Sequence, residues 1–397
     1  MALPVQLPLD QPHPLRAPVR LRELQAQGVM HEVVTKVGDR AWLVTGYHEV
    51  ERLFADPRLG RSHPDPDHAP RSGESALFGG PMGNFETEHA DHERMRALMQ
   101  PHFSPARVRA LRPRVEALCE DSLDRLAGTA QPADLIAALA LPLPIEVICE
   151  LLGVPFTDRD EFRQWTQATA DTTDRARSSQ GLTSLFEYGL RLVAAKRTSP
   201  GDDFISRLCA EDGVTDDEAA MLSMGLLFAG YETTVVAIGT GALLLLTHPE
   251  QQLSLRADPA RIPAAVEEIL RVPNRGGGGG IPRYARADLA IGDVMIRAGD
   301  LVLLDQGAAN HEEAMFADAD RFDARRFSAG QSPSGHLTFG YGPRYCIGAP
   351  LARLELTIVF TQLISRFPEL RLAVQVAELS FNRTAVTGGL ASLPVRW

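Results

Sequence analysis

One cysteine stands in a setting that suits a metal ligand. Cys346 lies in the run FGYGPRYCIG, with Gly340 and Gly342 before it and Gly348 after it. Glycines on both sides let the backbone turn tightly, reach positive φ and approach a flat ligand. Backbone N–H groups in such a turn, and the N-terminus of the apolar helix expected around Pro350, favour a thiolate over a thiol. The alternative is a buried structural cysteine, which is the commoner role of a lone cysteine.

A second pattern places an acid and an alcohol side by side in an apolar helix. Thr215 and Glu218 form a capping box, which opens a helix of roughly 30 residues, about 45 Å long at 1.5 Å per residue. Glu232 and Thr233 fall midway along it. An unpaired carboxylate buried there would cost free energy, which points to a functional role. A threonine there can instead donate to the carbonyl oxygen four residues earlier and bend the helix without a functional role.

Two further pairs have helical spacing. His92 and Arg96 are four residues apart and share one helix face, which for a typical pair is a solvated charged face. A metal site built on His89 and His92 is a weaker alternative, because the chain contains no HExxH. Glu268 and Arg271 are three residues apart and, taken alone, predict an ordinary surface ion pair that contributes little.

The cysteine run resembles the haem-binding loop of the cytochromes P-450, the haem-thiolate monooxygenases, and in particular that of soluble bacterial members. It matches every defining position of that loop, namely Phe339, Gly340, Gly342, Arg344, Cys346 and Gly348. The resemblance implies haem b with Cys346 as the axial ligand of the iron and the opposite face open for O2. It also implies that Glu232 and Thr233 relay protons to bound oxygen.

The same resemblance assigns cations to the two haem propionates, because buried carboxylates need cationic partners. The residues it assigns are His92, Arg96, Arg283 in the run IPRYA, His336 and Arg344. The Glu268–Arg271 pair, together with the run FDARRF at residues 322–327, matches the family's structural Glu-Arg-Arg network. That network would hold the haem core and take no part in the reaction.

Two glycine-containing segments are expected to shape the substrate pocket. Residues 60–87 form a long loop, and long loops are usually functional or disordered. Five consecutive glycines at 276–280 lack the GK[ST] of a phosphate loop, so a linker or a widened pocket wall is expected. A turn at 384–390 is a further candidate wall. The substrate candidates are Leu77, Phe78, Met82, Phe85, Ala229, Gly278, Ile281 and Val386.

The predicted fold class is mainly α with small β-sheets (α+β), in one haem domain that spans residues 1–397. The segment 107–208 is expected to be mainly helical, with a β-hairpin at 31–47 and short strands at 289–304. By resemblance, the haem lies between the long central helix and the helix that follows the cysteine loop.

Composition excludes several classes of protein. A net charge of −11 and a pI near 5.5 argue against nucleic-acid binding, which needs a basic field. The four cysteines are widely spread with no CxxC, as in a reducing cytosol. No signal peptide is visible, and the longest apolar run, 237–247, is too short to cross a bilayer. A cytoplasmic protein without a membrane anchor is expected, with a monomer as the default.

The resemblance also implies an external source of two electrons. The chain has no nucleotide-binding loop and no cysteine cluster for an iron–sulfur centre. A ferredoxin and its NAD(P)H-dependent reductase are therefore the expected partners. Four arginines give a basic stretch that could dock an acidic ferredoxin, although a solvated face is equally expected. They are Arg107, Arg109, Arg112 and Arg114.

The leading functional hypothesis is hydroxylation or epoxidation of an apolar small molecule in secondary-metabolite biosynthesis. An alternative on the same scaffold is oxidative coupling or ring closure of an aromatic or cyclic natural product, for which the glycine run would provide room. A third is a non-catalytic haem carrier, gas sensor or docking module. Loss of the cysteine loop or of the acid–alcohol pair would favour this third class, and both features are present.

Overall fold

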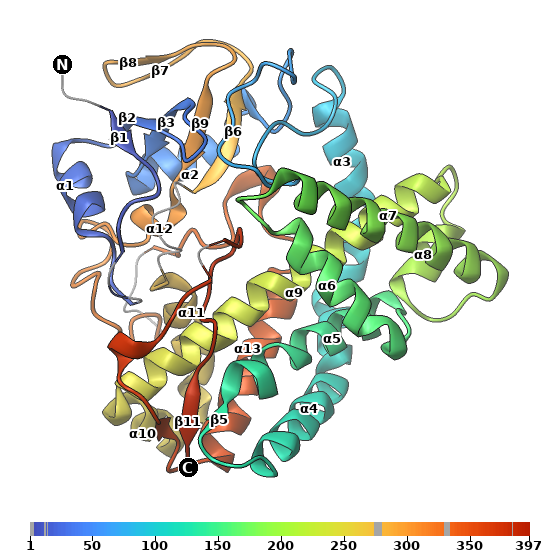
Figure 1. Cartoon of the computed structure of the whole chain (residues 1–397), viewed down its shortest axis with the longest axis vertical. Helices are drawn as coiled ribbons and strands as arrows, with labels where there is room; N and C mark the ends of the chain where they lie inside the picture. The colour runs from blue at the N-terminus through green and yellow to red at the C-terminus, as the bar shows by residue number, and fades with distance from the viewer. Residues whose placement is uncertain (1–3, 12, 14, 274–279, 329–333, 383) are drawn as a thin grey trace. The chain divides into compact units, whose positions relative to one another are not determined.

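A computed structural model describes residues 4–11, 13, 15–273, 280–328, 334–382 and 384–397 (Figure 1). Contacts within the chain group it into two units. The first contains Met1–Glu93, Thr172–Asp174 and Ala264–Cys346, and the second contains Arg94–Asp171, Arg175–Pro263 and Ile347–Trp397. The single domain expected from the sequence stays a prediction. The mixture of many helices and small sheets agrees with the predicted fold class.

The first unit is built on a six-stranded sheet with the order β1-β2-β3-β9-β6-β4. Its strands are β1 (Val5–Gln6), β2 (Met30–Val34), β3 (Arg40–Val44), β4 (Leu59–Gly60), β6 (Ile281–Ala285) and β9 (Leu301–Leu304). The antiparallel β2–β3 pair confirms the predicted hairpin. Strand β6 runs antiparallel to both of its neighbours, β9 and β4, and places Arg283 opposite Val302.

The first unit also contains helices, of which α1 (Val19–Gln27) and α2 (Tyr47–Ala55) pack on this sheet. The others are α3 (Glu88–Met99), α11 (Ile262–Arg271) and α12 (Gln306–Ala309), with a 3-10 turn at Gly342–Arg344 and a β7 (Leu289–Ile291)–β8 (Val294–Ile296) ribbon. The unit boundary falls within α3 and near the start of α11. In α2, Val50, Leu53 and Phe54 recur at helical spacing and bury one face with Val302 and Leu304 of β9.

The second unit is mainly helical. Its helices are α4 (Pro105–Ala127), α5 (Pro142–Leu152), α6 (Arg159–Thr169), α7 (Arg175–Thr198), α8 (Phe204–Ala210), α9 (Asp216–Thr247), α10 (Pro249–Ala257) and α13 (Ala349–Arg366). Short helical turns lie at Gln100–Phe103, Ile136–Ala140, Phe156–Asp158, Pro259–Arg261 and Val376–Glu378. A small antiparallel sheet has the order β10 (Arg371–Leu372), β11 (Pro394–Arg396), β5 (Ala133–Asp134).

Helix α9 is the long central helix that the sequence predicts. It spans 32 residues, and the hydroxyl of Thr215 accepts the amide of Glu218 at 3.1 Å, which confirms the predicted N-cap. It packs against α5, α7 and α13. A Cβ atom on Gly230 would lie 2.9 Å from the Cδ1 of Ile148 on α5. This glycine therefore has a packing role, because it lets α5 approach α9 closely.

The whole of α9 is also long and apolar enough to cross a membrane, although its longest uninterrupted apolar run is not. Of its most apolar stretch of 18 residues, 56% is buried inside the protein. A core helix of a water-soluble protein has the same length and composition, so this feature is weak support for a membrane span.

An ion network with a fully buried centre joins α11 to the segment before the cysteine loop. Glu268 accepts hydrogen bonds from Arg271 at 2.7 and 2.8 Å and from Arg326 at 3.1 Å. Arg271 also donates to the carbonyl oxygens of Asn310 and Ala319. Because Glu268 and Arg271 are 0% exposed, the local prediction of a surface ion pair is wrong. The Glu-Arg-Arg network implied by the resemblance is present, with Arg326 as its third member.

Arg326→Gln should lower the free energy of unfolding by about 3 kcal/mol, because it leaves a buried carboxylate with less counter-charge. Arg325→Gln is the matched control. It breaks a pair with Asp323 in which the arginine is 60% exposed, so it should cost less than about 1 kcal/mol. Urea unfolding followed by circular dichroism measures both variants. Equal losses in the two would contradict the structural role of Arg326.

Candidate functional site

The cysteine loop turns as its glycines predict. Gly340 and Gly342 have φ angles of +72° and +70°, in the left-handed region that side chains disfavour. A Cβ atom on Gly342 would lie 2.9 Å from the Cβ of Ala55 on α2, so this glycine also permits a close approach. The amide of Cys346 donates to the carbonyl oxygen of Phe339 at 2.9 Å, and the cysteine itself is exposed.

A buried carboxylate anchors this loop to α3. Glu88, in the first turn of α3, accepts a hydrogen bond from Nη2 of Arg344 at 2.5 Å. The backbone amides of Arg61 and Ser62 donate to it at 2.6 and 3.0 Å. A Cβ atom on Gly60 would overlap the carboxylate, so the glycine leaves room for it. Burial alone would raise the pKa of Glu88, but hydrogen bonds from the Ser62 hydroxyl and from the two amides, together with the charge of Arg344, lower it.

Arg283 on β6 is a buried cation without an acidic partner. Its Nη1 donates to the carbonyl oxygen of Pro282 at 2.9 Å, and no carboxylate in the described ranges lies within ion-pair distance. The residue is only 7% exposed. Burial, followed by the charges of Arg61 and Arg344, lowers the pKa of Arg283 to about 9. A guanidinium group keeps its proton in proteins, so this position calls for a bound anion.

Arg61 belongs to the same group, although the sequence did not single it out. Its Nη2 donates to the carbonyl oxygen of Leu77 at 2.6 Å and contacts the Sδ of Met82 at 3.0 Å. Its guanidinium carbon lies 5.4 Å from the ring centre of Phe78. Three of the four predicted pocket residues in the 60–87 loop thus hold Arg61, which only the folded contacts could reveal.

Arg286, at the end of β6, is the fourth arginine of this group. It donates to the carbonyl oxygen of Phe85 at 2.6 Å, and its guanidinium carbon lies 3.9 Å from the centre of that ring. Its Nη1 is 3.4 Å from the Glu88 carboxylate. We name Arg61, Arg283, Arg286 and Arg344 the arginine cluster. Among the described residues, Glu88 is the one acid that forms an ion pair with any of the four.

His336 has partners that differ from the predicted propionate. Its Nε2 lies 3.2 Å from the Glu267 carboxylate on α11, and its Nδ1 accepts the amide of Thr338 at 3.3 Å. The side chain is 2% exposed. Both ring nitrogens therefore have partners within the chain, and the propionate contact of His336 stays a prediction.

His92 and Arg96 both lie on α3, and both are half-buried. Their spacing of four residues on a continuous helix gives them the shared face that the sequence predicts. In the described part of the chain, no group of three or more His, Cys, Asp or Glu side chains could hold a metal ion. The alternative metal site on His89 and His92 therefore gains no support.

On α9 the acid and the alcohol are both held by hydrogen bonds. The Thr387 hydroxyl donates to Oε2 of Glu232 at 2.8 Å, a contact that the sequence analysis missed. Burial raises the pKa of Glu232, and the bond from Thr387 opposes that rise. The Thr233 hydroxyl donates to the carbonyl oxygen of Ala229 at 2.8 Å, as the alternative interpretation expects. A half-buried acid beside a hydroxyl nevertheless has the chemistry of a proton donor and its carrier.

The remaining substrate candidates are divided between the two units. Ile281 is the half-buried first residue of β6 in the first unit. In the second unit, Ala229 is exposed on α9 and Val386 is half-buried in the turn that also carries Thr387. Gly278, like most of the glycine run, lies outside the described residues.

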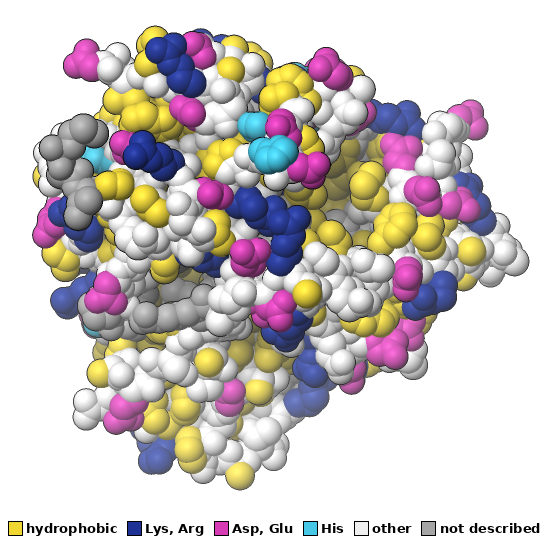
Figure 2. Space-filling model, turned by 45° about the horizontal axis from the view of Figure 1, so that its top comes forward, with side chains coloured by type: hydrophobic (Ala, Val, Ile, Leu, Met, Phe, Trp, Pro, Cys, Tyr) yellow, Lys and Arg dark blue, Asp and Glu magenta, His cyan; other side chains and the backbone are white. Residues whose placement is uncertain are grey.

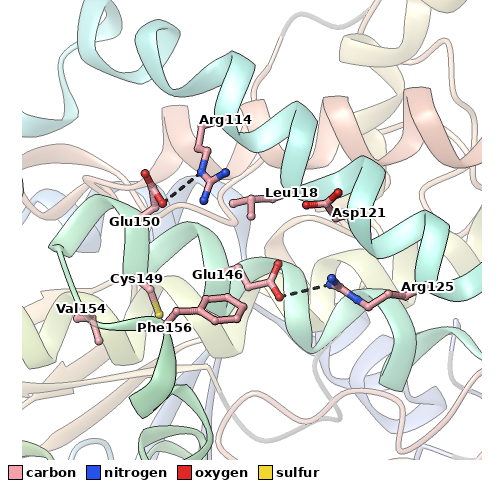
Figure 3. Close-up of a pocket in the computed structure, with 9 residues that line it drawn as sticks. All are labelled: Arg114, Leu118, Asp121, Arg125, Glu146, Cys149, Glu150, Val154 and Phe156. Atoms are coloured by element: carbon pink, nitrogen blue, oxygen red, sulfur yellow. Dashed lines mark hydrogen bonds and ion pairs between the residues drawn. The ribbon is translucent and has the colours of Figure 1, made fainter.

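A surface hollow of ≈270 Å³ lies between α4 and α5 (Figure 3). Arg114 pairs with Glu150 at 3.2 Å and Arg125 with Glu146 at 3.3 Å, so both of its arginines are held by acids of α5. Burial raises the pKa of Glu146, although Arg125 opposes this. None of the predicted haem, relay or substrate residues lines the hollow, and we assign it no part in the site. Its lining residues are Arg114, Leu118, Asp121, Arg125, Glu146, Cys149, Glu150, Val154 and Phe156.

Comparison with known proteins decides what these features belong to. A family model for the cytochrome P-450 matches residues 191–388. Pentalenolactone synthase of Streptomyces exfoliatus is 43% identical over 98% of this chain and 98% of its own length. The chain belongs to the cytochrome P-450 family. The mycinamicin IV hydroxylase/epoxidase of Micromonospora griseorubida is 37% identical, with 100% of this chain and 99% of that protein covered.

A solved cytochrome P-450 has the same fold. The substrate-free P-450 PimD, an epoxidase of the polyene macrolide antibiotic pimaricin, aligns with a TM-score of 0.89 and 39% identity over 100% of both chains. This confirms the predicted fold class. It also confirms the predicted enzyme class, an oxidoreductase of the monooxygenase type, because the relatives are named as hydroxylases and epoxidases.

The residues of the first unit fit the haem that membership of the P-450 family implies. Cys346 offers an exposed thiol in a glycine-rich loop, and a thiolate is the axial ligand of P-450 haem iron. The arginine cluster carries four positive charges around one ionised carboxylate. The two propionates of haem would supply the anionic partner that Arg283 lacks among the described residues. The chemistry of these donors therefore matches the cofactor.

The basic stretch predicted for a P-450 redox partner is exposed on α4, and its members are Arg107, Arg109, Arg112 and Arg114. Two of the four are already paired. Arg112 contacts an acid of the same helix at 3.1 Å, and Arg114 contacts Glu150 at 3.2 Å. Charges of both signs are also interspersed over the face of the molecule in Figure 2. The solvated-face interpretation therefore holds for Arg112 and Arg114.

Arg283→Gln should accelerate haem loss by about 10- to 100-fold, because a hydrogen bond between charged groups contributes about 1.5 to 3 kcal/mol. The measurement is haem transfer to excess apomyoglobin, followed by absorbance. Arg286→Gln is the matched control from the same cluster, and its smaller effect is expected because Glu88 and the Phe85 carbonyl already occupy that guanidinium. Haem loss from Arg283→Gln at the wild-type rate would remove Arg283 from the cofactor site.

Proposed function

We propose that the chain is a haem-thiolate monooxygenase that transfers one oxygen atom of O2 to an apolar small molecule. The reaction would be a hydroxylation or epoxidation in secondary metabolism. The relatives' names support this class of reaction, since they include a mycinamicin hydroxylase/epoxidase and a pimaricin epoxidase. The observation that carries the proposal is Arg283 in the unit that presents Cys346, a buried guanidinium for which the described residues offer no acidic partner.

In this proposal Cys346 is the axial ligand of haem b, and three members of the arginine cluster bind its propionates. Arg283 and Arg344 are the members that the sequence predicts, and Arg61 is added by its contacts. His92 and Arg96 on α3 are proposed as further donors. Haem bound through a thiolate supplies the activation of O2. The chain's own residues bind and orient that group, exclude water and supply protons.

Glu232 and Thr233 are proposed as the proton relay. Burial raises the pKa of Glu232, which favours a carboxyl that retains a proton to donate. The adjacent Thr233 hydroxyl both donates and accepts, so it can pass a proton on after releasing its bond to Ala229.

Electrons would come from a ferredoxin and its NAD(P)H-dependent reductase, and the protein would work as a cytoplasmic monomer. Of the basic stretch, Arg107 and Arg109 form no ion pair within the described chain and remain the proposed contacts for an acidic ferredoxin. The substrate would contact the half-buried side chains of the 60–87 loop, together with Ile281, Ala229 and Val386. Oxidative coupling is not proposed, because residues 276–279, most of the glycine run on which it rested, lie outside the described residues.

A spectral-shift screen tests the substrate class. Apolar macrolide and terpenoid compounds are added to the ferric protein, and displacement of iron-bound water is followed in the Soret region. Compounds that shift the spectrum are then turned over under ¹⁸O2 with spinach ferredoxin and its reductase. The proposal expects a product that carries one labelled oxygen atom. A coupled or cyclised product without the label would instead support oxidative coupling.

Thr233→Ala should raise the peroxide released per NADPH consumed severalfold, because protons would reach bound oxygen less efficiently. Thr234→Ala is the control on the same helix, since that hydroxyl also donates to the carbonyl oxygen four residues earlier, at 2.9 Å. It should leave the peroxide yield near that of the wild type. If the Thr233 variant keeps the wild-type yield, this residue has no part in the relay.

A further inference from the structure

The turn at residues 384–390 is fixed on two sides within the second unit. The amide of Val386 donates to the carbonyl oxygen of Ala170 at 2.9 Å, next to the end of α6. On the other side, a Cβ atom on Gly389 would lie 2.8 Å from Cγ2 of Val236 on α9. Gly389 has a φ of +100°, so both its conformation and its contact with α9 require glycine. The turn is therefore held against the helix that carries Glu232.

The side chain at the centre of this turn contacts Glu232, the half-buried acid of α9. The Oγ1 of Thr387 donates to Oε2 of Glu232 at 2.8 Å, and Thr387 is 4% exposed. Within the described ranges, this is the one hydrogen bond that the Glu232 side chain makes. Two influences act on its pKa, burial first and then the bond from Thr387. The orientation of the carboxylate thus depends on one hydroxyl group.

Neighbours on α9 do not provide a substitute. The Thr233 hydroxyl donates to the carbonyl oxygen of Ala229 instead. The Tyr231 hydroxyl is buried and has no hydrogen-bond partner among the described residues. Burial, followed by the charge of Glu232, raises the pKa of Tyr231. No ion pair within the described chain holds Glu232 in place of Thr387.

We propose that Thr387 is a positioning residue for the proton relay, because its hydroxyl holds the Glu232 side chain in one orientation. The inference rests on the proposed function, since it gives the relay acid a fixed direction. It also joins the acid to the turn that carries Val386, a predicted substrate contact. A substrate that displaces this turn would move the acid with it, so that binding and proton supply are linked through one hydrogen bond.

The first test is an infrared titration of the Glu232 carboxyl in the ferric holoprotein. Its carbonyl band is assigned by its loss in Glu232→Gln. Thr387→Val keeps the shape of the side chain but removes the bond that stabilises the carboxylate, so the carboxyl pKa should rise. Thr387→Ser should restore the wild-type titration. Thr247→Val is the matched control on α9, where the hydroxyl donates to the carbonyl oxygen of Leu243.

The second test is the peroxide formed per NADPH in air-saturated buffer with spinach ferredoxin and its reductase. Thr387→Val should release severalfold more peroxide than the wild type, and Thr387→Ser should not. Thr247→Val should match the wild type. These readouts separate positioning from stability, because a purely structural threonine would lower the melting temperature without shifting the titration of Glu232.

The outcomes distinguish this inference from the proposed function. An unchanged Glu232 titration and peroxide yield in Thr387→Val would overturn the role of Thr387, whatever the proposed function. A wild-type protein that binds no haem through a thiolate would overturn the proposed function. The infrared band of the haem-free chain would then still show whether Thr387 holds Glu232, but a role in a proton relay would be lost with the relay.

Discussion

The first unit is organised around an excess of buried positive charge. Arg61, Arg283 and Arg344 act on one another electrostatically, and Glu88 offsets one charge of the cluster. A buried charge without a partner is costly, so a chain that keeps this arrangement is built for an additional anion. Gly60 leaves room for the Glu88 carboxylate, and Glu88 in turn fixes Arg344 two residues before Cys346. The cofactor assignment depends on this imbalance of charge.

The second unit satisfies a different constraint, a carboxylate inside an apolar helix. Capping by Thr215 and small residues such as Gly230 let α9 run buried among α5, α7 and α13. Glu232 is tolerated there because Thr387 donates to it and because burial favours its protonated form. The same two conditions suit a proton donor. The hydrogen bond from Thr387 to Glu232 therefore serves both the stability of the fold and the proposed proton relay.

Local patterns in the sequence predicted local features of the backbone, namely turn conformations and the start of a helix. The glycines of the cysteine loop predicted its positive φ angles, and the capping box predicted the start of α9. The partners of those residues could not be predicted in this way. Thr387 and Arg344 reach carboxylates 155 and 256 residues away along the chain, and no spacing rule connects such pairs. The pairing of His336 with Glu267 was missed for the same reason.

The most direct test of the account is the spectrum of the reduced protein with carbon monoxide bound. Thiolate ligation by Cys346 predicts a Soret band shifted to the red in the wild type, and Cys346→Ala should abolish that shift. Cys209→Ala, at a half-buried cysteine on α8, should leave it unchanged. A wild-type band at the position typical of histidine-ligated haem, or a red-shifted band that survives in Cys346→Ala, would contradict the assignment of Cys346 as the axial ligand.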